Sequence, residues 1–171
     1  MQLERIYFFT SSILGWKHLL KDDSFKKVII NSLYYLSDNS FITIYSFVIM
    51  PNHIHLIFEL NKLNGKEMPH ESFMKYTAHE FRKLLLGTDK LEEYLVDSST
   101  RLYQFWQRDS LAVELYSRKV IEQKLSYIYR NPVQPHWNLC RDFVDYYYSS
   151  ASFYEIGSSD FKFLKHYMDR I

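Results

Sequence analysis

The segment FITIYSFVIMPNHIHLIFEL, residues 41–60, constrains the fold more than any other part of the sequence. Both of its halves are rich in β-branched and aromatic residues, which favour strands, and only Pro51 and Asn52 separate them. This spacing predicts a tight hairpin of two antiparallel strands, 41–50 and 53–60, although Pro-Asn is not one of the strongest hairpin dipeptides. The fold is therefore expected to contain a sheet built on this hairpin.

The remaining elements define the order in which strands and helices alternate. Apolar residues recur at helical spacing in three segments, which predicts helices at residues 22–39, 70–86 and 117–131. Short β-prone runs predict further strands at residues 5–10 and 102–107. The order strand–helix–strand–strand–helix–strand is the ferredoxin-like βαββαβ pattern. It predicts an α+β fold in which helices cover one face of an antiparallel sheet.

The chain has 171 residues, of which 47% are hydrophobic and 18% aromatic, and this composition is that of a folded protein. We expect one domain over residues 1–171, with about 155–171 as an appended tail. The N-terminal residues lack the apolar region of a signal peptide, and no apolar run approaches the roughly 18 residues that span a membrane. The single cysteine, Cys140, excludes an internal disulfide and fits a reducing compartment. These features predict a cytoplasmic protein without a membrane partner.

The first chemical signal is the pair His53 and His55 at the start of the second hairpin strand. Residues two apart on a strand point to the same face, so the two imidazoles lie side by side while Ile54 and Leu56 face the opposite layer. Two neutral imidazoles arranged in this way can bind one divalent metal with a third ligand from elsewhere. A pair of surface or hydrogen-bonded histidines is the alternative interpretation, and the pair alone identifies no reaction.

The second signal lies on the predicted helix 117–131. Tyr127 falls outside the apolar stripe of this helix, Asn131 follows it by one turn, and Lys124 precedes it by three residues. Tyr129 lies about 200° from Tyr127 around the axis, so the two tyrosines cannot serve one site. A tyrosine can act as a nucleophile, but its pKa of about 10 means that it needs activation at neutral pH. A metal ion that polarises a phosphoryl oxygen would supply it, and Lys124 would favour the phenolate. In a chain with 15 tyrosines, the alternative is that Tyr127 only packs.

The segments VIMPNHIHLI and YIYRNPV, residues 48–57 and 127–133, closely resemble those of single-tyrosine HUH transposases, in particular the REP-associated tyrosine transposases. YQFWQRD at 103–109 and DYYYSS at 145–150 extend the resemblance, which runs from about residue 5 to 155. The family fold is ferredoxin-like. One departure is the stretch NPVQPHWN at 131–138, where relatives often have a small Ala-Gly turn.

The resemblance implies a site and a reaction. It implies that His53, His55 and Asn131 bind Mg²⁺ or Mn²⁺ and that Tyr127 is the nucleophile. In this family the tyrosine attacks a phosphate of single-stranded DNA, which leaves a 5′-phosphotyrosine and a free 3′-hydroxyl. The expected function is thus DNA cleavage and strand transfer in transposition, with single-stranded or hairpin DNA as the partner and a monomer or homodimer as the assembly.

Contacts to DNA need cations for the backbone and aromatic rings for the bases. Trp16 and Lys17 follow the first strand and are the best candidates outside the motifs, with Lys124 and Arg108 as further candidates. A solvated surface charge is the alternative for each cation, and Arg108 would equally form an ion pair with Asp109.

Two other functions remain open from the sequence. One is a catalytically idle or domesticated protein that binds single-stranded or hairpin DNA. The other is a metal-dependent phosphodiesterase in which Tyr127 is structural. Trapping of a covalent protein–DNA adduct separates both from the transposase-type enzyme.

Overall fold

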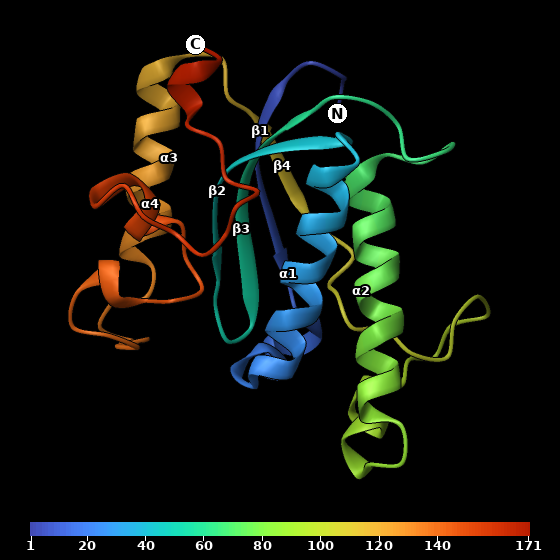
Figure 1. The fold of residues 1–171 in the computed structure, drawn as a ribbon. Helices are drawn as coiled ribbons and strands as arrows, with labels where there is room; N and C mark the ends of the chain where they lie inside the picture. The colour runs from blue at the N-terminus through green and yellow to red at the C-terminus, as the bar shows by residue number, and fades with distance from the viewer.

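The computed structural model describes residues 1–171 and contains one four-stranded sheet (Figure 1). The strands are β1 (Ile6–Ser12), β2 (Ile42–Ile49), β3 (His53–Leu60) and β4 (Leu111–Glu114). They are ordered β2-β3-β1-β4, and every neighbouring pair is antiparallel. A βαββαβ chain gives this order when each helical crossover passes over one intervening strand. The predicted α+β, ferredoxin-like fold is confirmed.

Helices α1 (Asp23–Asp38) and α2 (Pro69–Leu85) cover one face of the sheet (Figure 1). Alternate strand residues such as Phe9 and Ile54 join Leu33 of α1 and Phe81 of α2 in the larger core cluster. Asp22 caps α1 because its carboxylate accepts a hydrogen bond from the Ser24 amide at 2.8 Å. The helices of the βαββαβ unit therefore lie on one face, as predicted.

Helix α3 (Arg118–Arg130) lies on the opposite face together with the short α4 (Ala151–Glu155) (Figure 1). Ile121, Leu125 and Ile128 of α3 pack against a second set of sheet residues that includes Phe8 and Ile57. The apolar stripe expected on this helix is thus its buried face. The sheet is consequently covered on both faces. The site is built where side chains of β3 and α3 face each other.

The strand register places particular side chains beside the histidine pair. In the β1–β3 ladder Thr10 lies opposite His55, and Ser12 lies opposite His53. The Met50 amide donates to the His53 carbonyl at 2.8 Å and closes the hairpin turn. The even residues Ile54 and Leu56 belong to the core on the α1–α2 side, so the two imidazoles face α3.

The prediction of a strand at residues 102–107 is wrong. Phe105 and Trp106 are buried there, but they pack against α2, and the Trp106 indole donates a hydrogen bond to the Thr77 hydroxyl at 3.0 Å. The fourth strand follows at Leu111–Glu114, where it is an edge strand with the exposed side chains Leu111 and Val113. An edge strand of this kind lacks the apolar alternation that would reveal it in a sequence.

The helical spacing of Phe73, Tyr76, Phe81 and Leu84 predicts that they share the buried side of α2. Phe73 and Phe81 are buried, but Tyr76 and Leu84 are exposed. Thr77 takes a buried position instead, because its hydroxyl donates to the Phe73 carbonyl at 2.8 Å. Because this hydrogen bond satisfies the hydroxyl, the polar Thr77 can occupy a core position.

The C-terminal residues, expected to be an appended tail, pack against the sheet. Phe161, Phe163 and Leu164 join the larger core cluster, and the Lys165 amide donates to the Ile44 carbonyl at the edge of β2. None of the helices is both long and apolar enough to cross a lipid bilayer. The remaining helical segments are 3₁₀ turns: η1 (Leu14–Trp16), η2 (Leu19–Lys21), η3 (Asp89–Tyr94), η4 (Phe143–Asp145) and η5 (Tyr167–Asp169).

Candidate active site

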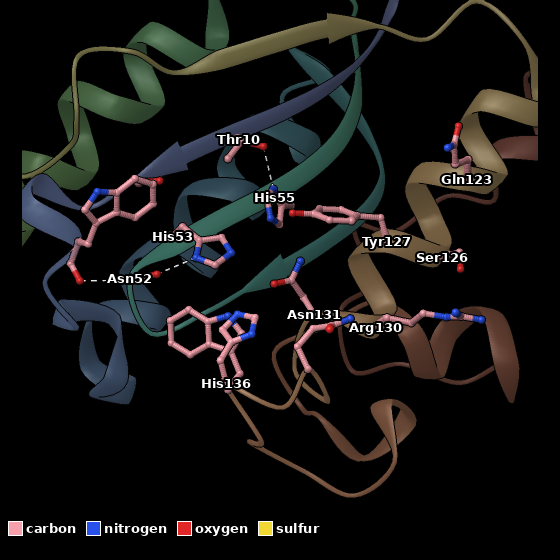
Figure 2. A pocket seen from close by; sticks show the side chains of 14 residues that line it. Thr10, Asn52, His53, His55, Gln123, Ser126, Tyr127, Arg130, Asn131 and His136 are labelled. Carbon is pink, nitrogen blue, oxygen red and sulfur yellow. Dashed lines mark hydrogen bonds between the residues drawn. The ribbon is translucent and has the colours of Figure 1, made fainter.

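An open cleft of about 730 Å³ lies between the sheet and α3. Strands β1 and β3 contribute its floor, α3 contributes one wall, and loop residues that include Trp16 and Trp137 contribute the rest. The four residues for which the sequence indicated a site, His53, His55, Tyr127 and Asn131, all line it (Figure 2).

The two histidine rings lie with their centroids 4.8 Å apart, and each is oriented by a neighbouring side chain. His53 Nδ1 is 2.7 Å from Asn52 Oδ1, and His55 Nδ1 is 2.7 Å from Thr10 Oγ1 (Figure 2). An amide oxygen only accepts hydrogen bonds, so His53 carries its proton on Nδ1 and leaves the Nε2 lone pair free. His55 Nε2 is buried and has no hydrogen-bond partner.

Burial keeps both imidazoles neutral. It lowers the pKa of His53 to about 4, although the neighbouring Asn131 side chain opposes this shift. Burial, with the nearby His53 and Lys124, lowers the pKa of His55 to about 3. A neutral imidazole binds a metal without first losing a proton. At neutral pH this pair is therefore ready to act as a pair of nitrogen ligands.

Tyr127 projects from α3 toward the histidines. Its ring centroid is 5.1 Å from that of His55 and 5.9 Å from that of Phe8, and its hydroxyl points to His55 (Figure 2). The side chain is half exposed, so a substrate can reach its hydroxyl from the cleft. The Lys124 ammonium lies 4.6 Å from the Phe8 centroid and 5.8 Å from the Tyr127 centroid. Hence both a cation and the His55 imidazole lie close to the phenol ring.

Asn131 completes the group at the C-terminal end of α3. It is buried, and its amide points toward the two histidines from a position below Tyr127 in this view (Figure 2). No group of three or more His, Cys, Asp and Glu side chains is arranged to hold a metal, and the Asn131 amide oxygen is one candidate third ligand beside the two imidazoles. The unpartnered His55 Nε2 and the free lone pair of His53 fit such an ion, because both are donors without another role.

Tyr129, two residues after Tyr127, faces the other way. It packs against Tyr154 and Phe143 in the core between α3 and the C-terminal segment. Burial raises the pKa of its hydroxyl far above the ordinary value. The predicted separation of the two tyrosines is confirmed, and Tyr129 cannot reach the cleft.

The residues considered for DNA contact are placed in different parts of the surface. Trp16 lines the cleft, and Lys124 stands beside it. Lys17 does not line it: its ammonium donates to the Glu93 carbonyl at 2.7 Å. Arg108 lines a separate hollow beside α2 and forms no ion pair with Asp109.

Sequence reasoning missed Thr10 and Asn52, which orient the imidazoles, and Arg130 and Trp137, which line the cleft. Asn52 directly precedes His53, so its place in the turn could have drawn attention to it. Thr10 could be found only from the strand register. Trp137 belongs to the stretch that departs from the family pattern, and nothing in the sequence shows that this stretch returns to the histidines.

No family model matches the sequence, and no curated protein is significantly similar to it. Among solved structures, the chain is similar to a REP-associated tyrosine transposase bound to a REP hairpin, with a TM-score of 0.63 and 17% sequence identity. The likeness covers 88% of this chain and 79% of that one. A candidate transposase from Deinococcus radiodurans R1 gives a TM-score of 0.45 at 13% identity, over 75% of this chain and 91% of that one. The first match shows a shared fold, which agrees with the resemblance in the two sequence motifs.

Proposed function

We propose that the protein is a transposase-type enzyme that cuts and joins single-stranded DNA through a covalent bond to Tyr127. His53, His55 and Asn131 would hold Mg²⁺ or Mn²⁺ beside the phenol. The observation that carries the proposal is the position of the Tyr127 hydroxyl next to His55, which forms with His53 a pair of neutral imidazoles that have free ring nitrogens.

The charge of the cleft favours a polyanionic substrate. None of the residues that line it is Asp or Glu, although the chain has 20 of them. Arg130 lines the cleft and Lys124 stands beside Tyr127, and neither forms an ion pair. Both remain available for phosphate groups.

The chemistry assigned to the chain is a transfer of one phosphodiester bond. The Tyr127 oxygen attacks a DNA phosphorus, the bond from phosphorus to the 3′-oxygen breaks, and the 3′-oxygen takes up a proton to leave as a hydroxyl. The phenolic proton passes to solvent in the open cleft as the new phosphorus–oxygen bond forms, and the Lys124 ammonium, 5.8 Å from the Tyr127 ring centroid, is placed to contact the phosphate. A bound divalent ion supplies electrophilic polarisation of the phosphoryl oxygen. Because the new bond conserves the phosphoester, a 3′-hydroxyl can later attack it and rejoin DNA.

The type of DNA is proposed from similarity. The similar solved structure is described as bound to a REP hairpin, and the motifs around His53 and Tyr127 resemble those of the same family. Hairpin DNA with an unpaired flank is therefore the substrate that we propose, with a cytoplasmic location and a monomer or homodimer as the working form.

The decisive experiment is to trap a covalent adduct on single-stranded and hairpin DNA in the presence of Mn²⁺. The wild-type protein should form an adduct at Tyr127, identified by mass spectrometry. Tyr127→Phe removes only a half-exposed hydroxyl that has no hydrogen bond in the protein, so the variant should fold and bind DNA but form no adduct.

Tyr129→Phe is the matched control on the same helix. Its hydroxyl is buried without a hydrogen-bond partner, so its removal should leave adduct formation intact. DNA binding without adduct or cleavage would instead favour an idle DNA-binding protein. Metal-dependent cleavage that survives in Tyr127→Phe would favour a phosphodiesterase without a covalent intermediate.

A further inference from the structure

We propose that Trp16 and Trp137 form a stacking site for an unpaired nucleobase of the DNA strand that enters the cleft. The inference rests on the proposed function, because it takes single-stranded DNA as the ligand. It adds a site for a base, whereas the proposed chemistry concerns only a phosphate.

Trp137 lies directly beside the proposed metal ligands. Its ring centroid is 5.7 Å from that of His53, 5.6 Å from that of His18 and 5.5 Å from that of His136. The turn after α3 holds it there, since the Trp137 amide donates to the Gln134 carbonyl at 2.9 Å. The indole is only partly buried and lines the cleft. Part of an aromatic ring is thus exposed to the space where a strand would pass.

Trp16 presents the second ring from the loop after β1. Its side chain is 61% exposed and lines the same cleft, which is an unusual position for the largest apolar side chain. Its backbone has a φ of 57°, a left-handed conformation that L-residues with bulky side chains rarely adopt. Strained backbone of this type is often found at functional sites. Neither the exposure nor the strain serves the hydrophobic core.

The Asn52 side chain connects the Trp16 loop to His53. Asn52 accepts from His53 Nδ1 through Oδ1 and donates to the Trp16 carbonyl through Nδ2 at 3.1 Å (Figure 2). The position of the Trp16 loop is therefore fixed relative to His53. A base held by the tryptophans would belong to a nucleotide close to the phosphate at Tyr127.

The combination of rings and cations matches the requirements of single-strand binding. Arg130 lines the cleft for phosphate contact, and each base offers a face that stacks on an indole. In a duplex the bases are already paired and stacked, so only an unpaired base can enter. Stacking of this type tolerates any base. It therefore predicts that the site prefers unpaired to paired bases and does not select one type of base.

Two probes of equal length and charge test the site: an oligothymidylate and a strand of abasic nucleotides. Binding is measured in the Tyr127→Phe protein by intrinsic tryptophan fluorescence and by anisotropy of labelled probes. Of the three tryptophans, Trp106 is buried and hydrogen-bonded to Thr77, so the change should come from Trp16 and Trp137. The oligothymidylate should quench the fluorescence and bind at least about tenfold more tightly than the abasic strand.

The variants separate stacking from folding. Trp137→Leu and Trp16→Ala should each weaken oligothymidylate binding about five- to a hundredfold and leave abasic binding unchanged. Trp137→Phe keeps an aromatic face and should restore most of the affinity. Tyr35→Leu, on α1 at the far face of the sheet, is an exposed-aromatic control that should have no effect.

Equal affinity for the two probes would overturn the stacking site, as would equal losses on both probes in Trp137→Leu and Trp137→Phe. The adduct experiment is independent of this outcome. Selective loss of oligothymidylate binding in a protein that never forms an adduct would retain the stacking site and reject Tyr127 as the nucleophile. An adduct at Tyr127 in a protein that binds both probes equally would retain the nucleophile and reject the stacking site.

Discussion

Asn52 illustrates how one side chain can fix two parts of a site relative to each other. Its amide oxygen holds the proton of His53 on Nδ1, and its amide nitrogen anchors the Trp16 loop. Outer residues that orient a ligating histidine are commonly worth a factor of ten to a hundred in metal affinity. Asn52 is therefore a positioning residue whose two hydrogen bonds can be tested separately.

Asn52→Ala should lower the affinity for Mn²⁺ about ten- to a hundredfold, because the His53 ring loses the acceptor that sets its tautomer. Calorimetric titration of Mn²⁺ measures this without any DNA. Asn52→Asp keeps an acceptor for His53 and loses the donor to Trp16, so it should retain most of the metal affinity. Equal losses in the two variants would show that the acceptor has no specific role.

The buried histidines also predict how stability depends on pH in the metal-free protein. Burial lowers the folded pKa of His55 to about 3, whereas an unfolded histidine titrates near 6.5. Below about pH 6.5 the unfolded chain therefore binds a proton that the folded protein does not. The free energy of unfolding should fall as the pH decreases, by about 2 kcal/mol for His55 between pH 7.5 and pH 5.

Urea unfolding at the two pH values, with a chelator present, measures this loss. His55→Gln should lose less stability over the same interval than the parent protein, since the titrating group is gone. His79→Gln, at an exposed position on α2, is the matched control. If His55→Gln and the parent lose the same free energy, His55 is not protonated on unfolding in this range.

At the scale of elements, local patterns predicted most of the fold. The hairpin and helices α1, α2 and α3 lie within two residues of the expected bounds, because the spacing of apolar residues and the Pro51–Asn52 break in the hairpin are local signals. Local signals failed where tertiary contacts decided the outcome. The apolar run at 102–107 packs on α2, and the true edge strand at Leu111–Glu114 exposes its apolar residues.

The same limit applies to how the site is assembled. His53, His55, Tyr127 and Asn131 could be identified from two short motifs, but no pattern in α3 says which face of the sheet the helix covers. That choice depends on the packing of Ile121, Leu125 and Ile128 against the face that carries Phe8 and Ile57. The contributions of Thr10 and Trp137 follow from register and loop path, which are long-range properties.

The whole molecule has nearly balanced charge, with 21 Lys and Arg against 20 Asp and Glu. It therefore has no large positive field to attract duplex DNA in general. The cleft differs from this average because it contains no acidic side chain, Arg130 lines it, and Lys124 stands beside the proposed nucleophile. Binding should accordingly depend on a few local contacts and on unpaired bases.

This balance predicts both a preference and a weak dependence on salt. A hairpin with an unpaired flank should bind more tightly than a blunt duplex of equal length, because the flank supplies bases for the cleft. Two phosphate contacts give a slope of log affinity against log salt of about −1.5 for a single strand, whereas six to ten contacts on a duplex give about −5 to −9. Anisotropy titrations of both probes at several salt concentrations measure the slopes.

Arg130→Gln should reduce the slope for the hairpin by about 0.7, since one contact is lost. Tighter binding of the blunt duplex, or a slope as steep as that of a general duplex binder, would contradict the assignment of this cleft to single-stranded DNA.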